Sequence, residues 1–323
     1  MSEGGQGEGG GGNVRVRRFE VDQNFEGWRL DSFLANRVSR LSRSRVGEIA
    51  RNGGVELSPP RRARPGLRLR RGDVVTLRER LPDERVQDDE VEILYKDEVL
   101  LALNKPAGML VHEAASQRLN TVQHYLGRAG FEGAEPVHRI DRETSGVLVC
   151  SLARGHVAPL REQFAGRGTR KVYRALALDP DGRWEVGQRS RLDTPLGLDP
   201  ASLTGVRMGR GDLSALTHVE VLGRREGGPH GAMADLAVRI ETGRQHQIRV
   251  HLALEGTPIA GDKLYGQTDD FFRALADDPD DEALLATLPF PRHALHAWRL
   301  RLKHPDTGEP VAFEAPLPAI WGE

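Results

Sequence analysis

The segment VHRIDRETSGVLV, residues 137–149, carries Asp141 between an apolar lead-in and a turn of small polar residues. The apolar run that follows predicts a buried strand. Asp141 is therefore expected at the mouth of this strand, beside Arg139 and Arg142. Nearby cations favour the ionised form of a carboxyl group and lower its pKa. An ionised carboxylate can act as a nucleophile or a base, although the segment alone also fits a surface turn held by a salt bridge.

Four further motifs surround this segment. In chain order they are NKPAGMLVH at 104–112, KVYRAL at 171–176, TGRQHQIRVHL at 242–252 and PIAGDKLYG at 258–266. Together with HRIDRETSG, the ordered set resembles the RluA-type pseudouridine synthases, and the resemblance extends over residues 90–318. It implies an isomerase that converts uridine to pseudouridine in RNA. The bond from ribose to uracil nitrogen breaks and is remade to carbon.

The resemblance also implies roles for individual residues. Asp141 is the essential carboxylate, which either attacks the sugar or abstracts a sugar proton, and Arg249 pairs with it. Tyr173 stacks on the uracil and takes part in the final deprotonation, and Ile248 belongs to the apolar pocket floor. The remaining substrate-binding expectations are Arg139 as the side chain that enters the RNA, His138 as a residue that shapes the loop, and Lys105 as an RNA contact.

The region from residue 28 to residue 80 is strongly basic. It contains 14 Arg, no Lys and five acidic residues, a net charge of +9, whereas the whole chain has a net charge of −1. Clustered arginine is typical of a surface that binds a phosphate-rich partner. Apolar spacing predicts two short helices, near Leu30 and near Val46, followed by strands at 55–57 and 74–77.

This basic region resembles the RNA-binding domain first seen in the ribosomal protein S-four. The motifs that carry the resemblance are RLDSFL at 29–34, SRSRV at 42–46, GV at 54–55 and GDVV at 72–75. The usual Asn-Gly turn between the two strands is replaced by PPRR at 59–62. The resemblance implies phosphate contacts, which supply affinity without sequence choice. A solvated helix face is the alternative for the expected RNA-binding residues Arg43, Arg45, Arg51, Arg61 and Arg62.

The expected fold class is α+β throughout, over 323 residues. A small α+β RNA-binding module precedes a catalytic domain with a mixed, largely antiparallel sheet flanked by helices, as the family resemblance implies. We expect four parts: a disordered Gly-rich tail at 1–13, the module at 14–81, a linker at 82–90 and the catalytic domain at 91–323. Residues 181–212 and 267–288 have the composition of insertions, and Trp184 with several arginines would let the first of them extend the RNA surface.

The reaction gains no atoms, so we expect no redox cofactor and no ATP. No metal site is expected either, because His246 and His251 are five residues apart rather than at the i, i+4 spacing of a helical zinc pair. The single cysteine, Cys150, excludes cysteine-based zinc and iron–sulfur sites. Apolar runs are too short for a membrane helix and the N-terminus lacks a secretory pattern, so we expect a cytoplasmic monomer.

The expected partner is RNA, with large-subunit ribosomal RNA first and transfer RNA as the alternative. A second alternative is a catalytically silent RNA-binding or ribosome-assembly factor, against which the joint presence of Asp141, Tyr173 and Arg249 argues. A retaining glycosidase would need a second carboxylate about 5 Å from Asp141. Glu143 is the nearest candidate in the sequence.

Overall fold

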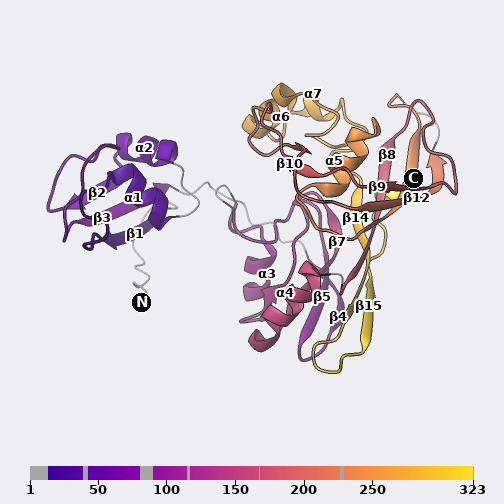
Figure 1. The fold of residues 1–323 in the computed structure, drawn as a ribbon, viewed down its shortest axis with the longest axis horizontal. Coiled ribbons are helices and arrows are strands. Elements are labelled where there is room, and N and C mark those ends of the chain that lie inside the picture. Colours follow the sequence, from indigo (N-terminus) through magenta and orange to yellow (C-terminus); the bar gives the residue numbers. More distant parts are fainter. Residues whose placement is uncertain are drawn as a thin grey trace. The chain divides into compact units, whose positions relative to one another are not determined.

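The computed structural model describes residues 14–38, 43–80, 90–114, 117–166, 168–225 and 229–322. The chain divides into two compact units, Met1–Arg85 with Ala114–Arg118, and Val86–Glu113 with Leu119–Glu323 (Figure 1). The expected tail at 1–13 lies outside the described residues, as does the expected linker at 82–90 apart from Glu90. None of the described helices is long and apolar enough to cross a membrane.

The first unit is a three-stranded antiparallel sheet with two helices. Its elements are β1 (Val14–Glu20), α1 (Leu30–Arg37), α2 (Arg43–Arg51), β2 (Val55–Ser58) and β3 (Val74–Arg80), with strand order β1-β3-β2. Leu30, Phe33 and Leu34 are fully buried, as the helical spacing requires. They belong to one hydrophobic cluster with residues of the central strand β3. The predicted helices and strands of this region are confirmed.

The second unit is built on one large mixed sheet. The strand order is β4-β5-β7-β14-β8-β13-β12-β9, with β6 paired to β7 and β15 to β14. Every pairing is antiparallel except the short one between β7 and β14. The bounds are β4 (Glu92–Lys96), β5 (Leu100–Lys105), β6 (Glu135–Pro136), β7 (Ser145–Ser151), β8 (Arg170–Leu178), β9 (Arg189–Leu192), β12 (Thr217–Arg225), β13 (Met233–Ile240), β14 (Leu295–Lys303) and β15 (Pro310–Glu314). The predicted mixed, largely antiparallel sheet is confirmed.

Helices cover both faces of this sheet. Alternation along β5 sends Leu101 and Leu103 to one apolar cluster and Leu100 and Ala102 to another. The first cluster includes residues of α3 and α5, and the second includes Leu160 of α4. Figure 1 shows α3 and α4 near β4 and β5, and α5, α6 and α7 toward the other end. The helices are α3 (Val122–Arg128), α4 (Val157–Ala165), α5 (Gln247–Leu254), α6 (Asp269–Asp277) and α7 (Glu282–Leu285).

The two expected insertions contain regular structure. Residues 181–212 hold β9 and the hairpin of β10 (Leu196–Leu198) and β11 (Met208–Arg210), and residues 267–288 hold α6 and α7. Trp184 is 1% exposed and its indole nitrogen donates to Thr257 Oγ1. The expectation that Trp184 adds to an RNA surface is therefore wrong. The indole ring of Trp184 packs in the hydrophobic core of the catalytic unit.

Candidate active site

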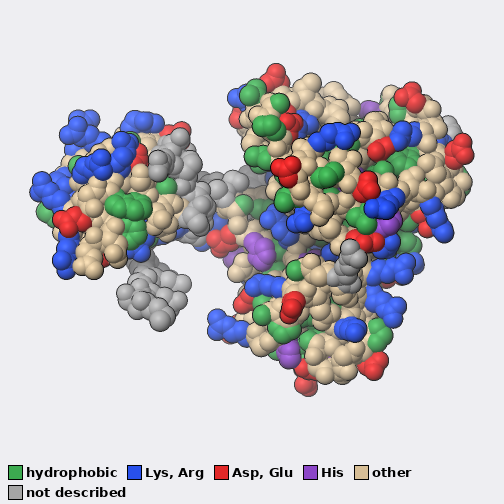
Figure 2. All heavy atoms as spheres, viewed as in Figure 1, with side chains coloured by type: hydrophobic (Ala, Val, Ile, Leu, Met, Phe, Trp, Pro, Cys, Tyr) green, Lys and Arg blue, Asp and Glu red, His purple; other side chains and the backbone are tan. Residues whose placement is uncertain are grey.

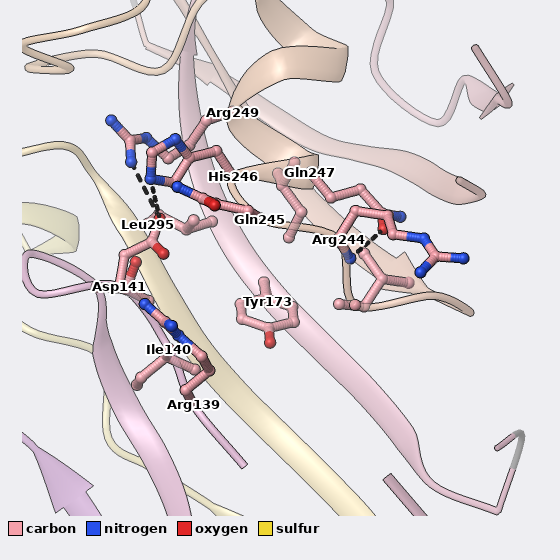
Figure 3. A pocket seen from close by; sticks show the side chains of 14 residues that line it. Arg139, Ile140, Asp141, Tyr173, Arg244, Gln245, His246, Gln247, Arg249 and Leu295 are labelled. Carbon is pink, nitrogen blue, oxygen red and sulfur yellow. Dashed lines mark hydrogen bonds and ion pairs between the residues drawn. The ribbon is translucent and has the colours of Figure 1, made fainter. Parts of the chain in front are cut away.

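A cavity of about 160 Å³ opens where β8, β13, α5 and the segment before β7 meet. Five of the residues predicted from the sequence line it: Arg139, Asp141, Tyr173, Ile248 and Arg249. Figure 3 shows the side chains of Arg139, Asp141, Tyr173 and Arg249, with that of His246, around a common hollow. The structure therefore brings together side chains from three motifs that are far apart in the sequence.

The turn after Asp141 is held by buried contacts to the segment that leads into β14. Thr144 Oγ1 lies 2.9 Å from His293 Nε2, and Ser145 Oγ lies 2.9 Å from His296 Nδ1. Gly146 has a φ of +109°, and a Cβ there would lie 2.2 Å from the Ala297 carbonyl oxygen. A side chain would clash with that backbone, so glycine is required where β7 runs parallel to β14. Each residue of the TSG motif thus helps to fix Asp141.

Arg249 links the candidate catalytic carboxylate to a second, buried one. Its Nε and Nη2 donate to Asp262 at 2.6 and 2.9 Å, and its Nη1 donates to Asp141 Oδ2 at 3.0 Å. Asp262 is 1% exposed, and its Oδ1 also accepts from the backbone nitrogens of Leu264 and Tyr265. These bonds are charge-assisted and geometrically specific. They leave the guanidinium little freedom to turn away from Asp141.

The electrostatics keep Asp141 ionised. Burial opposes its charge, but the charge and hydrogen bond of Arg249, together with the neighbouring His246 and His293, outweigh burial and hold the pKa of Asp141 below its usual range. His246 Nε2 lies 3.9 Å from Asp141 Oδ2. Burial, reinforced by Arg249, lowers the pKa of His246 to about 4, so this imidazole is neutral near pH 7. The site therefore presents a carboxylate beside one permanent cation and one neutral ring.

Tyr173 projects from β8 into the cavity and is 9% exposed. Burial, together with the charge of Asp141, raises the pKa of its hydroxyl above the ordinary tyrosine value. The phenol is therefore protonated near neutral pH. Its ring and the apolar side chains of Ile248 and Leu295 supply the flat, apolar part of the lining.

The remaining substrate-binding expectations separate into two groups. Arg139 is exposed and lines the cavity. His138 does not line it: the ring stacks on Phe164 at 4.2 Å, and Nε2 accepts a hydrogen bond from Val149 N. Burial lowers the pKa of His138 to about 3, so the imidazole is neutral near pH 7. It supports the motif through packing and a hydrogen bond.

Lys105 is fully buried, with 0% exposure. Its ammonium group donates to the carbonyl oxygens of Pro106, Met109 and Arg142, at 2.7, 2.8 and 3.1 Å. In this structure Lys105 therefore contacts the motif loops rather than the surface, and its position is unlike that of an RNA contact. The bond to Arg142 ties the NKPAG segment to the segment that carries Asp141.

The arginines of the first unit differ in their availability. Arg51 and Arg62 are exposed. Arg61 is half-buried and binds Asp73 and the carbonyl oxygen of Arg68, so it holds its own unit together. The side chains of Arg43 and Arg45, on α2, lie outside the described residues.

Sequence reasoning assigned no role to Asp262 or Tyr265, and it gave His246 a structural or RNA-contacting role rather than that of a metal ligand. The Tyr265 hydroxyl lies 2.9 Å from His246 Nδ1 and accepts from Met208 N on β11 at 3.0 Å. Asp262 and Tyr265 both belong to the motif PIAGDKLYG. Their place in one of the quoted motifs was the only sequence feature that could have indicated a role. Glu143, the carboxylate a glycosidase would need, is bound to Lys263 at 2.7 Å and does not line the cavity.

Comparisons with known proteins agree with this geometry. A family model described as RNA pseudouridylate synthase matches residues 99–254. "Ribosomal large subunit pseudouridine synthase D" of Zymomonas mobilis is 36% identical over 314 residues, covering 92% of this chain and 93% of that protein. The protein of the same name from Pseudomonas aeruginosa is 32% identical and covers 94% of each chain.

Among solved structures, human RNA Pseudouridylate Synthase Domain Containing 1 matches with a TM-score of 0.55 and 25% identity. The match covers 72% of this chain and 86% of that one. The matches to the two sequence relatives extend over nearly the whole length of both chains. The chain therefore belongs to the RNA pseudouridine synthase family, in the branch of these synthase D relatives, and is an RNA pseudouridine synthase.

Proposed function

We propose that this enzyme converts specific uridines of large-subunit ribosomal RNA to pseudouridine, with Asp141 as its essential carboxylate. The observation that carries the proposal is the bond from Arg249 to Asp141, which holds an ionised carboxylate at the wall of a cavity with an aromatic side chain. The substrate class follows from the relatives, which are named ribosomal large subunit pseudouridine synthases. Such a substrate implies work in the cytoplasm.

Asp141 starts the reaction from its ionised form. It either attacks the sugar carbon that bears uracil or abstracts a sugar proton to give a glycal, and in both cases the carbon–nitrogen bond breaks. The detached uracil turns and bonds to the sugar through carbon; in the first route this breaks the bond between Asp141 and the sugar, and in the second Asp141 returns the proton to the sugar. The bonded uracil carbon loses its proton, the ring nitrogen gains one, and the atoms balance without a cofactor. Arg249 keeps Asp141 charged and aimed during these steps.

Tyr173 holds the detached base and takes part in its final deprotonation. The base must turn without leaving, which requires a flat apolar partner rather than a fixed set of hydrogen bonds. Ile248 completes the floor of the cavity. We propose that the enzyme acts as a monomer.

The target nucleotide must leave its stack before it reaches Asp141, at a cost of a few kcal/mol. Arg139 compensates for this cost by entering the gap, because a guanidinium plane can stack on bases and bond to phosphate together. Its exposure at the rim of the cavity supports this role. The first unit, with its exposed Arg51 and Arg62, acts as the S-four-like RNA-binding module that grips phosphates.

Pseudouridine mapping tests the proposal. Carbodiimide adducts are read by reverse transcription on ribosomal and transfer RNA from cells lacking the protein, complemented with wild type or Asp141→Ala. We expect ribosomal RNA stops that vanish in the deletion and return only with wild type. Changes confined to transfer RNA would show that transfer RNA, not ribosomal RNA, is the substrate. An unchanged pattern, with RNA binding retained, would favour an assembly factor.

A further inference from the structure

A second hollow, of about 510 Å³, lies in the catalytic unit beside the candidate active site. It is lined by residues 168–170, 239–241, 301–303 and Pro310, which lie at neighbouring ends of β8, β13, β14 and β15. We call this site the basic hollow. Ile240 lines both the basic hollow and the catalytic cavity, so the two adjoin at the end of β13.

Three cations of the basic hollow lack a counter-ion. Arg170, Arg301 and Lys303 are exposed, and none of them forms an ion pair with any residue that the structure describes. Arg301 and Arg170 are direct cross-strand partners. Like charges in that position are destabilising, so folding alone does not explain them. Figure 2 shows Lys and Arg side chains gathered on the side where β15 lies.

The acidic residue of the lining does not neutralise these cations. Glu241 accepts from His218 Nε2 at 2.9 Å and from Arg239 Nη1 at 3.3 Å. Both of its partners lie next to it on β12 and β13. The charge of Glu241 is thus balanced locally, and the excess positive charge stays with Arg170, Arg301 and Lys303.

Two further features belong to the lining of the basic hollow: a hydroxyl group without a hydrogen-bond partner, and a strand end held by hydrogen bonds. Thr169 is 9% exposed, and its hydroxyl has no hydrogen-bond partner among the described residues. Buried hydroxyls of this kind are rare and call for an explanation. Gln163 of α4 bonds both the nitrogen and the carbonyl oxygen of Lys303, at 3.1 and 3.0 Å, which fixes this end of β14.

We propose that the basic hollow binds the phosphodiester backbone of the RNA next to the target uridine. This inference rests on the proposed function. Ile240 lines both the basic hollow and the catalytic cavity, so nucleotides that flank the flipped base can pass this end of the sheet. A polyanion supplies the negative charge that Arg170, Arg301 and Lys303 lack. The site contributes affinity and register, not base choice.

The test compares two full-length triple variants with the same change in charge. The first is Arg170→Gln with Arg301→Gln and Lys303→Gln. The control is Lys96→Gln with Arg154→Gln and Arg273→Gln, three exposed cations outside both hollows. Filter binding to a large-subunit ribosomal RNA transcript is measured from 50 to 200 mM salt, and pseudouridine formation is followed in the same samples.

We expect the first variant to bind the transcript roughly tenfold or more weakly, with a salt slope lower by about two, as three lost phosphate contacts require. Its kcat/KM should fall by a similar factor, while its Tm stays equal or rises because Arg301 and Arg170 no longer repel. The control should match wild type. Equal loss in both variants, or none in the first, would overturn the inference. Absence of pseudouridine from the wild-type sample would instead count against the proposed function, since binding is read separately.

Discussion

Arg249 is fixed by Asp262 through two hydrogen bonds, of 2.6 and 2.9 Å, and its remaining terminal nitrogen faces Asp141, the proposed catalytic carboxylate. Asp262 is buried and ionised, because the charge and hydrogen bonds of Arg249, together with His293 and the Tyr265 backbone nitrogen, outweigh the burial that opposes ionisation and hold its pKa below the ordinary range. The pair therefore works as a rigid bracket, and only Nη1 is left to face Asp141. Catalytic geometry at this site thus depends on a residue that does not line the cavity.

Substitution of Asp262 tests this dependence. In Asp262→Ala the guanidinium of Arg249 stays buried without its main partner, and breaking a buried pair costs about 3–5 kcal/mol. Urea unfolding should show this loss. Asp262→Asn keeps the shape and part of the hydrogen bonding, so it should fold better and still lose kcat. Wild-type kcat in the asparagine variant would show that Arg249 does not depend on the charge of Asp262 for its position.

Arg249 should set the acid limit of activity. The wild-type pKa of Asp141 lies below its ordinary value because Arg249, with His246 and His293, outweighs burial, so Asp141 remains ionised well below neutral pH. In Arg249→Met the main influence that opposes burial is lost, and the pKa of Asp141 should rise. The acid limb of the kcat/KM profile should therefore move to higher pH. Arg249→Lys should return part of the shift, and identical limbs in all three proteins would contradict this assignment.

The ring and the hydroxyl of Tyr173 can be separated by two variants. Tyr173→Phe keeps the flat surface, so RNA affinity should hold while pseudouridine formation slows by about 10²- to 10⁴-fold, the usual contribution of a positioned proton-transfer group. Tyr173→Ala should lose turnover and also the retention of the detached base. Quenched-flow assays on the mapped RNA would measure both. A fully active phenylalanine variant would leave the hydroxyl without a role.

Lys105 should make stability depend on pH above neutrality. Burial lowers its pKa from 10.5 to about 7 in the folded protein. Between these values the unfolded chain binds more protons than the folded one, so the free energy of unfolding rises with pH through this window. Lys105→Met removes that rise and also leaves three carbonyl oxygens without their donor. Denaturant titrations at pH 6.5 and 9 would check both effects; an unchanged pH slope in the variant would refute the buried titration.

Gly146 should tolerate no side chain. A Cβ would meet the Ala297 carbonyl oxygen at 2.2 Å, and the positive φ is strained for any other residue. We expect Gly146→Ala to separate β7 from β14 and to lose both stability and activity. Gly127→Ala, on α3 where a Cβ meets nothing within 4 Å, is the matched control and should behave as wild type in thermal unfolding. Equal Tm values for the two variants would contradict the expectation.

The elements of the fold were predictable wherever a periodic apolar pattern was strong. The strands β5, β7 and β13 and the helix α1 follow directly from such patterns. The start of α5 was less predictable: the pattern extends back to Gln245, but His246 adopts a left-handed conformation with a φ of 55°, and the helix begins at Gln247. There His246 Nδ1 lies 2.9 Å from the Tyr265 hydroxyl, a tertiary contact that helix propensity does not reveal.

The candidate site was predictable as a set of motifs but not as an arrangement. Asp141 and Arg249 are 108 residues apart, and only the folded sheet brings them to 3.0 Å. Lys105 shows the opposite limit, because a lysine in a Pro-Gly loop reads as a surface cation although three carbonyl oxygens hold it inside. Charge in a sequence does not reveal whether its partner is solvent, RNA or the protein's own backbone.

The buried bonds from Thr144 and Ser145 to His293 and His296 have a consequence for how the enzyme is made. These partners are 149 and 151 residues apart in the chain. During synthesis, the segment that carries Asp141 emerges long before the strand that fixes it. The nascent enzyme therefore stays catalytically incomplete until β14 has left the ribosome, and any chain that stops before residue 293 lacks the partners that lock its own active site.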